Sequence, residues 1–539
     1  MRWKKILKID KEVHFGRELN VFINRPKNLT ELLKETVNKF PENEALVMGG
    51  TRITYKEMLE KVENIAGNLQ NLYNIRKGDR IALLLGNSIE FALLVFACAR
   101  VGAIVVPLNT RLKQEELIYM LNQSESNLLF VDDEFVSRAE EIRKSSTTNL
   151  QYYFLVGSQT SQYKEYTPFD VLEQQSTVNQ ILIDETDPLF IMYTSGTTGL
   201  PKGAVGNYLG AIHSSMNYEY ILNTDEQTKT LIAVPLFHVT GLIGQLIHMV
   251  KVGGTSVIMR RFKTEEYLRL ISEEEISFLF NVPTIYVMLI AHKDFANYSY
   301  HFVKNIAYGG APMSTETLHA IRSYFINAKL QNAYGATETH SPATIMPKTY
   351  SNEKLASVGL PVPVAEMIVV NEYDEPCQPG EVGELLIKGP MVIEGYWKND
   401  VANENSFFGD YWRSGDLATI DNDGFVYIMD RKKDMINRGG EKIFSIEVEN
   451  ILYEHPKVLE AAVVGIPDEK WGEVVKAVIV PKADVEIEAE EIKTFVSQKL
   501  ANFKVPQVIE FVSELPRNPG GKILKNVLKN WTQKSIEQN

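Results

Sequence analysis

The sequence from residue 193 to residue 203 reads Tyr193-Thr194-Ser195-Gly196-Thr197-Thr198-Gly199-Leu200-Pro201-Lys202-Gly203. It extends an apolar run, residues 189–193, that is typical of a buried strand. The stretch holds four serine and threonine hydroxyls, three glycines and one lysine. Glycine lets backbone N–H groups approach an anion closely, hydroxyls add donors, and a lysine adds a cation. The pattern therefore indicates a strand that leads into a phosphate-binding loop.

Two other interpretations compete for this stretch. A P-loop requires glycine directly before the lysine and serine or threonine directly after it. Lys202 instead stands between Pro201 and Gly203, so the spacing excludes that motif. A loop rich in serine, threonine and glycine is also a common surface turn. From this stretch alone the turn and the phosphate loop are about equally good interpretations.

The composition describes a globular protein with more than one domain. With 539 residues, 44% of them hydrophobic, the chain is too long for a single core. Its net charge of −13 disfavours a nucleic-acid partner, because phosphate backbones are bound by a basic excess. Cys98 and Cys377 form neither a metal-binding pattern nor a disulfide framework. No apolar run is long enough to span a bilayer, and these features together indicate a cytosolic enzyme without integral membrane association.

Helical and strand patterns alternate along the first two thirds of the chain. Helices are expected at 29–40, 56–73, 89–101 and 114–122, and buried strands at 80–85, 103–108, 128–131, 189–193, 230–234, 255–259, 278–282 and 305–308. Such alternation predicts an α/β fold whose parallel sheets are covered by helices. Ligands of these folds bind beyond the carboxyl ends of the strands, where the stretch quoted above would lie.

Toward the C-terminus the pattern changes. Short strands and turns at 380–387 and 424–428 predict a small antiparallel β subdomain. A charged stretch then marks a boundary, so we expect a large domain at 1–430 and a small, mobile α+β domain at 431–539. The small domain is expected to contain a helix capped by Ser445, strands at 461–465 and 474–480, and a helix at 489–500.

Several further stretches resemble, in the right order, the signatures of the adenylate-forming superfamily. This superfamily includes acyl-CoA synthetases, luciferases and the adenylation domains of peptide synthetases. The matching stretches are 237–241, 309–312, 334–339, 414–417, 430–434, 439–443 and 516–523. Taken singly, their residues are more readily core aromatics, turn formers or solvated lysines. Together they follow the order of the superfamily's signatures over about residues 30–525, which favours a binding site over these separate structural roles.

The resemblance implies a site for ATP and Mg²⁺. Residues 194–199 and Lys202 would bind the β and γ phosphates, Thr337 would contact the α-phosphate, and Glu338 would hold Mg²⁺. Tyr334 would stack on the adenine, and Lys522 would bridge the attacking carboxylate and the phosphate. The other implied nucleotide positions are Gly309, Gly310 and Ala311 along the adenine edge, Gly335, Asp416 on the ribose hydroxyls with Arg431 assisting, and Gly439 and Gly440.

The chemistry of this superfamily explains why such groups are needed. A carboxylate is a poor acylating agent, so it first attacks the α-phosphate of ATP and expels pyrophosphate, giving an acyl-adenylate. Cations must stabilise the charge that gathers there, and the implied catalytic set is Lys202, Thr337, Glu338 and Lys522. A thiol must then reach the adenylate. The resemblance implies a rotation of the small domain between the two steps, about a hinge at Lys433.

The acid and the thiol are less well defined. The implied substrate pocket consists of apolar or small residues and His238, which suits a fatty or aryl acid: His238, Val239, Leu242, Ile243 and Gly310. Residues 227–264 contain no acidic side chain to pair with an ammonium group, which disfavours a free amino acid.

The stretch 465–472 resembles acyl-CoA synthetases in particular and favours coenzyme A as the thiol. One alternative is a ligase that loads a free-standing carrier protein. Another is a regulatory protein that binds ATP without turnover, and a luciferase-like oxygenase would need a special substrate. A homodimer is also left open.

Overall fold

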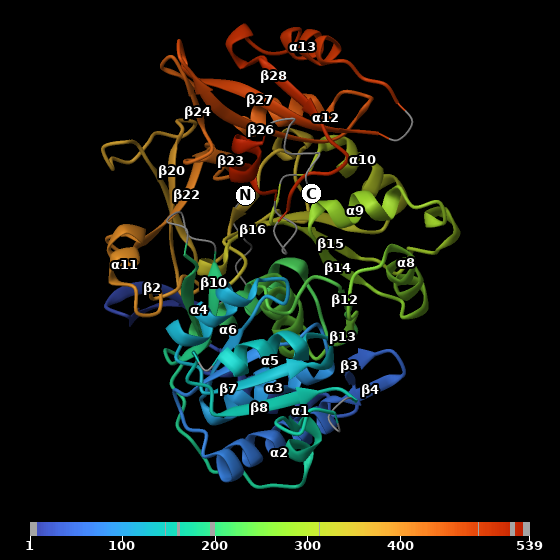
Figure 1. Cartoon of the computed structure of the whole chain (residues 1–539), viewed down its shortest axis with the longest axis vertical. Coiled ribbons are helices and arrows are strands. Elements are labelled where there is room, and N and C mark those ends of the chain that lie inside the picture. The colour runs from blue at the N-terminus through green and yellow to red at the C-terminus, as the bar shows by residue number, and fades with distance from the viewer. Residues whose placement is uncertain are drawn as a thin grey trace.

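The computed structural model describes residues 8–145, 147–158, 162–194, 200–311, 313–482, 485–517 and 523–531. Helices alternate with strands through most of the chain, and a smaller group of strands and helices lies at the C-terminal end (Figure 1). The predicted fold class, a large α/β domain with parallel sheets and a β subdomain followed by a small α+β domain, is confirmed.

Two mostly parallel sheets form the body of the large domain. Within the described ranges, the first sheet has the order β11-β10-β6-β5-β7-β8-β9 and the second β18-β17-β16-β15-β14-β12-β13-β3-β4. The first consists of β5 (Arg80–Leu84), β6 (Ile104–Pro107), β7 (Leu128–Asp132), β8 (Tyr152–Val156), β9 (Thr167–Pro168), β10 (Pro188–Thr194) and β11 (Lys202–Asn207). The second consists of β3 (Glu44–Met48), β4 (Thr51–Thr54), β12 (Lys229–Ile232), β13 (Thr255–Ile258), β14 (Phe278–Asn281), β15 (Asn305–Tyr308), β16 (Lys329–Tyr334), β17 (Thr344–Ile345) and β18 (Leu360–Pro361).

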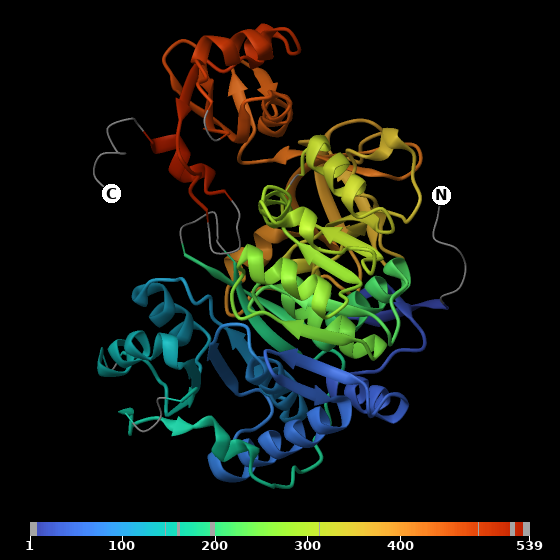
Figure 2. The same ribbon diagram turned by 90° about the vertical axis from the view of Figure 1, so that its right-hand side faces the viewer.

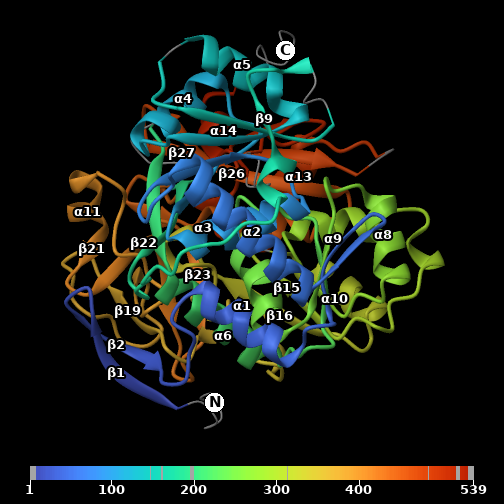
Figure 3. The same ribbon diagram turned by 90° about the horizontal axis from the view of Figure 1, so that it is seen from below.

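Helices cover both faces of these sheets. The largest core cluster joins the two sheets through α1 (Leu29–Lys39), α2 (Tyr55–Tyr73), α3 (Ile89–Val101) and α6 (Tyr208–Leu222). Figure 3 shows α1, α2 and α3 crossing the middle of the molecule. The outer face of the first sheet packs on α4 (Gln114–Gln123) and α5 (Val136–Ser145). The outer face of the second packs on α8 (Thr264–Glu273), α9 (Pro283–Ile290) and α10 (Thr315–Tyr324).

Local sequence explains where these helices begin. Thr54 and Glu57 form a reciprocal capping box at the start of α2. The Ser88 hydroxyl accepts from the Phe91 backbone N–H, as expected, and α3 then runs to Gly102. Residues Thr240–Ile247 form a π-helical segment that continues into α7 (His248–Val252). No helix in the described ranges is long and apolar enough to cross a bilayer.

An antiparallel subdomain follows the second sheet. It consists of β19 (Glu366–Val370), β20 (Gly383–Lys388), β21 (Phe407–Phe408), β22 (Tyr411–Ile420) and β23 (Val426–Arg431), with α11 (Asp400–Ser406) before β21. The N-terminal hairpin of β1 (Ile9–His14) and β2 (Arg17–Phe22) lies beside β19 (Figure 3). The Asn20 side-chain amide donates to Glu366 Oε1 at 3.0 Å and fixes that contact.

The C-terminal domain stands at one end of the molecule (Figure 2). It contains β24 (Ile436–Arg438), β25 (Glu441–Ile443), β26 (Val458–Asp468), β27 (Gly472–Pro481), β28 (Val508–Phe511), α12 (Ser445–Tyr453), α13 (Ala489–Ser497) and α14 (Lys525–Asn530). The expectation that Ser445 caps α12 is wrong, because Phe444 is the N-cap. The Ser445 backbone N–H and hydroxyl instead donate to the Asp430 carboxylate, at 2.5 and 3.0 Å.

Candidate active site

The quoted stretch closes a hairpin between antiparallel strands. Thr194 at the end of β10 pairs with Lys202 at the start of β11. Ser195, Gly196, Thr197, Thr198 and Gly199 lie outside the described residues. Gly203 is required after Lys202, because a Cβ atom there would lie 2.7 Å from the Ile191 side chain. The two ends of the predicted phosphate loop are therefore held side by side. The loop is followed by a strand, whereas a P-loop is followed by a helix.

Glu338 lies on a tight turn, Thr337–Thr339, directly after β16. The turn is crowded: a Cβ on Gly335 would lie 1.4 Å from the Ser341 carbonyl oxygen. Glu338 Oε1 accepts hydrogen bonds from Thr194 Oγ1 at 3.3 Å and from the Tyr396 hydroxyl at 3.0 Å. Both donors bond the same carboxylate oxygen. A carboxylate among hydroxyl oxygens is the donor set that Mg²⁺ prefers, so these residues fit the implied metal.

A second group joins the end of β16 to the β subdomain. The Tyr334 hydroxyl donates to Asp416 Oδ2 at 2.5 Å, and Arg431 Nε lies 2.8 Å from Asp416 Oδ1. Asp416 on β22 and Arg431 on β23 face each other in the strand register. Burial and the Asp416 carboxylate raise the pKa of Tyr334 well above its usual value, so its hydroxyl stays a donor. The structure thus brings together the residues implied for adenine and ribose.

Gly309, Gly310 and Ala311 follow β15, which pairs in parallel with β16. They therefore lie at the same edge of the sheet as Tyr334. A Cβ atom on Gly309 would lie 2.2 Å from the Ala333 carbonyl oxygen, and Gly310 has a φ of +81°. Both positions need glycine, which keeps the backbone at this edge free of side chains.

The implied acid pocket begins at His238. Its Nε2 atom is buried and has no hydrogen-bond partner among the described residues. Burial, and then the neighbouring Arg111 guanidinium, lower the pKa of His238 to about 4, so the ring is neutral. Val239, Leu242 and Ile243 are all buried in the main core, and Val239, at 8%, is the most exposed of the three. His238 therefore offers a buried polar atom without a described partner, next in sequence to apolar core residues.

Residues predicted in the C-terminal domain lie apart from this group. The Gly439 N–H donates to the Trp471 carbonyl at 2.7 Å, and the Gly440 N–H to Asn437 Oδ1 at 3.0 Å, both within that domain. Lys433 is exposed in the turn after β23. Lys522 lies outside the described residues.

Tyr396 is a residue that sequence reasoning missed. It approaches Glu338 from the segment after β20, more than fifty positions away in the chain. A tyrosine after a glycine carries no signal of its own, so only the tertiary structure reveals it.

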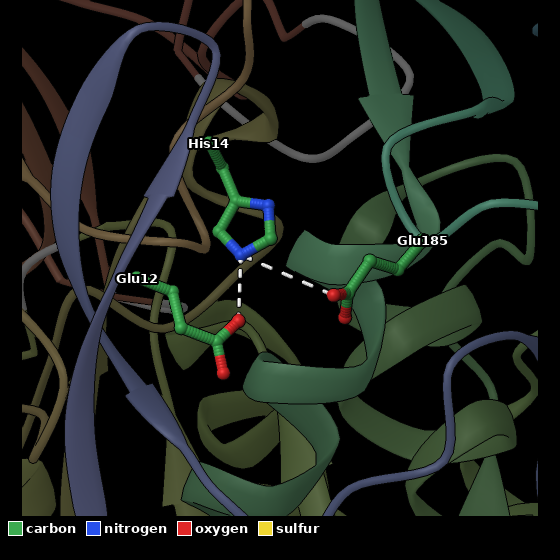
Figure 4. A group of neighbouring side chains, drawn as sticks. All are labelled: Glu12, His14 and Glu185. Carbon is green, nitrogen blue, oxygen red and sulfur yellow. Dashed lines mark hydrogen bonds and ion pairs between the residues drawn. The ribbon is translucent and has the colours of Figure 1, made fainter.

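A cluster of Glu12, His14 and Glu185 offers metal-ligand atoms within 4.8 Å of one another (Figure 4). His14 Nε2 lies 2.9 Å from Glu12 Oε2 and 3.9 Å from Glu185 Oε1. Arg25 bonds both carboxylates, and Lys27 lies 3.0 Å from Glu185. Arg25 and Lys27 already balance the charge of the two carboxylates, so we interpret the cluster as a structural contact and not as a metal site. It ties the N-terminal hairpin to the segment before β10.

Comparison with known proteins gives the family. Residues 33–397 match the AMP-binding enzyme family, and residues 447–522 match the AMP-binding enzyme C-terminal domain. The chain is 35% identical to a 2-succinylbenzoate–CoA ligase of Bacillus licheniformis, over 92% of this chain and 98% of that one. It is 32% identical to a feruloyl-CoA synthase of Amycolatopsis sp., over 91% and 96%.

The fold also matches solved structures. The o-succinylbenzoate CoA synthetase of Bacillus subtilis, solved with its acyl-adenylate intermediate, superposes with a TM-score of 0.82 at 32% identity, covering 95% of this chain and 99% of that one. The same protein has been solved with ATP and magnesium ion, and there the TM-score is 0.81. The chain belongs to the AMP-binding enzyme family, within the adenylate-forming acyl-CoA synthetase superfamily. It is an adenylate-forming enzyme, as its sequence predicts.

Proposed function

We propose that this chain is an acyl-CoA synthetase that activates a carboxylic acid with ATP and transfers the acyl group to coenzyme A. The observation that carries the proposal is the Tyr334–Asp416–Arg431 group, which is suited to a nucleoside. Its Tyr334 ends β16, the strand that leads into Glu338. A carboxylate that already accepts from Tyr334 and pairs with Arg431 is well oriented to accept further hydrogen bonds from ribose hydroxyls.

The residues divide the first step among them. Lys202 contributes a positive charge where the β and γ phosphates of ATP would lie, and the Thr337 hydroxyl donates to the α-phosphate. Glu338 would hold Mg²⁺, and the charge of the ion would offset that of the phosphates. Lys522 carries the acid's carboxylate to the α-phosphate. The acid attacks that phosphorus, pyrophosphate departs, and the acyl-adenylate remains for attack by the thiol of coenzyme A with release of AMP.

The acid is proposed to be aromatic or fatty. The unpartnered Nε2 of His238 can meet the polar end of the acid, while Val239 presents an apolar surface to its body. The two relatives named above carry names of aryl-acid ligases, which supports testing aryl acids first and fatty acids second. The coenzyme A in those names supports the same thiol here.

The remaining parts of the proposal concern the whole chain. We place the boundary of the large domain at residues 430 and 431 and the hinge at Lys433. The exposed turn that holds Lys433 is suited to backbone rotation. A cytosolic location fits the two cysteines, which are both free thiols.

Pyrophosphate release tests the proposal. The purified chain is given ATP, Mg²⁺ and one acid at a time from aryl, fatty and amino acid panels, with and without coenzyme A. We expect release that depends on an aryl or fatty acid, with formation of the acyl-CoA. Lys202→Met should abolish release, whereas Lys229→Met, which makes the same change at the start of β12, should leave it intact.

Two other results would each favour a different function. Equal reaction with pantetheine thiols would favour a ligase for a free-standing carrier protein. ATP binding without acid-dependent release would overturn the enzyme proposal and favour a regulatory protein.

A further inference from the structure

One segment joins the predicted phosphate hairpin to the Glu338 turn. The Ile393 N–H donates to the Glu338 carbonyl at 2.9 Å, the Val205 N–H to the Gly395 carbonyl at 3.0 Å, and the Trp397 N–H to the Gly203 carbonyl at 2.7 Å. Residues 393–397 therefore run between β11, which begins at Lys202, and the turn that carries Glu338. The position of the segment is fixed on both sides by backbone hydrogen bonds.

Tyr396 lies at the middle of this segment and contacts both functional side chains. Its hydroxyl donates to Glu338 Oε1 at 3.0 Å, and its ring centroid lies 5.3 Å from Lys202 Nζ. The side chain is part of a small core with Ala204, Ile393 and Ala402, and the residue is only 6% exposed.

Tyr396 lies between Lys202 and Glu338 and leaves each available for a different partner, phosphate for the lysine and Mg²⁺ for the carboxylate. Within the described ranges neither Lys202 nor Glu338 forms an ion pair, and each instead contacts Tyr396. The ring holds the ammonium through a cation–π contact, which is weaker than an ion pair and leaves its N–H groups available. The hydroxyl holds one carboxylate oxygen and thereby orients the other.

We infer that Tyr396 is a positioning residue that orients Glu338 for Mg²⁺ through its hydroxyl and Lys202 for phosphate through its ring. The inference rests on the proposed roles of Lys202 and Glu338 in binding ATP and Mg²⁺. It assigns each role to a different part of one side chain, so the two roles can be separated by substitution.

The experiment is calorimetric binding of a non-hydrolysable ATP analogue to the full chain, with and without Mg²⁺. Tyr396→Phe removes only the hydroxyl, and we expect the gain in affinity that Mg²⁺ provides to fall about 10-fold, the usual scale for a lost partner of a metal ligand. Affinity without Mg²⁺ should stay within about 2-fold of the wild type, because the ring that contacts Lys202 is kept. Tyr396→Leu removes the ring as well and should weaken metal-free binding too.

Controls separate positioning from stability. Tyr55→Phe removes another buried hydroxyl, which donates to the Met249 and Gly254 carbonyls far from Glu338, and should leave the Mg²⁺ gain unchanged. In a Glu338→Gln background, Tyr396→Phe should have no further effect on that gain. This second comparison still tests the role of the hydroxyl if the Tyr396→Leu variant does not fold.

The failures are distinguishable. If the wild type gains no affinity from Mg²⁺, the proposed function fails. If the wild type gains affinity and Tyr396→Phe gains as much, only the positioning role of the hydroxyl is overturned. If Tyr396→Leu binds metal-free ATP as tightly as Tyr396→Phe, the role of the ring is overturned.

Discussion

At the scale of single residues, Asp416 bonds Tyr334 and Arg431 at once. We predict that Asp416→Asn lowers kcat/KM for ATP about 30-fold or more, because it weakens the ribose contact and leaves the Arg431 guanidinium without its carboxylate, a loss of about 2 kcal/mol or more. Pyrophosphate-release kinetics measure this. Asp421→Asn makes the same change at the other end of the β22–β23 hairpin, where Asp421 pairs with Lys354. An equal fall in kcat/KM for ATP in both variants would contradict the assignment of Asp416 to the ribose.

Sequence patterns could indicate which residue types the site needs but not how they meet. The glycines before and after functional residues were recognisable because backbone approaches such as that of Gly335 exclude any side chain. The contact of Thr194 with Glu338 was not predictable, since Thr194 was expected to face phosphate alone. The role of Tyr396 was not predictable either, because its partners Lys202 and Glu338 lie on elements that are distant in sequence.

At the scale of elements, two buried histidines tie neighbouring segments together. His340 Nε2 accepts from the Asn207 N–H at 3.0 Å, and its Nδ1–H donates to the Met391 carbonyl at 2.7 Å. His213 makes the same pair of bonds, with the Phe22 N–H at 3.1 Å and the Leu209 carbonyl at 2.8 Å. Each ring must be neutral, because one nitrogen accepts from a backbone N–H. Burial lowers the pKa of His340 to about 4 and that of His213 to about 3.

These histidines predict a loss of stability in acid. The unfolded chain takes up their protons below about pH 6.5, whereas the folded chain does so only near pH 3 to 4, so stability falls as pH drops from about 6.5 and is unaffected above it. Each ring contributes up to about 1.4 kcal/mol per pH unit in that window. Urea unfolding of His340→Gln, which can still donate and accept, should show a flatter decline between pH 6.5 and 4. A decline as steep as in the wild type would refute this.

Element boundaries show where local rules are overridden. Ser445 looked like a helix cap, but the Asp430 carboxylate of β23 takes that role for α12. We predict that Asp430→Ala destabilises the C-terminal domain by about 1 to 2 kcal/mol, as loss of a helix cap does. Limited proteolysis should then cut within residues 445–531 faster than in wild type. Asp434→Ala, four residues on, is the matched control, and equal cleavage of the two variants would argue against the cap.

At the scale of the whole molecule, the last prediction concerns rotation of the C-terminal domain about Lys433. A largely buried ion pair, Lys525 Nζ to Glu449 Oε1 at 2.7 Å, anchors the segment that follows Lys522 within that domain. We therefore expect Lys522 to move with the domain as one body. Lys522→Ala should abolish adenylate formation, yet leave thioester formation from a supplied acyl-adenylate largely intact, because the second step needs the domain turned the other way.

The two half-reactions are measured separately, as pyrophosphate release and as acyl-CoA formation from synthetic adenylate. Lys525→Met gives the contrast: it leaves the Glu449 carboxylate buried without its cation, so it should destabilise the domain and impair both steps together. Lys522→Ala should keep the unfolding transition of the wild type. If Lys522→Ala instead lost both half-reactions equally while remaining as stable as the wild type, one fixed orientation of the domain would have to serve both steps, and Lys433 would not be a hinge.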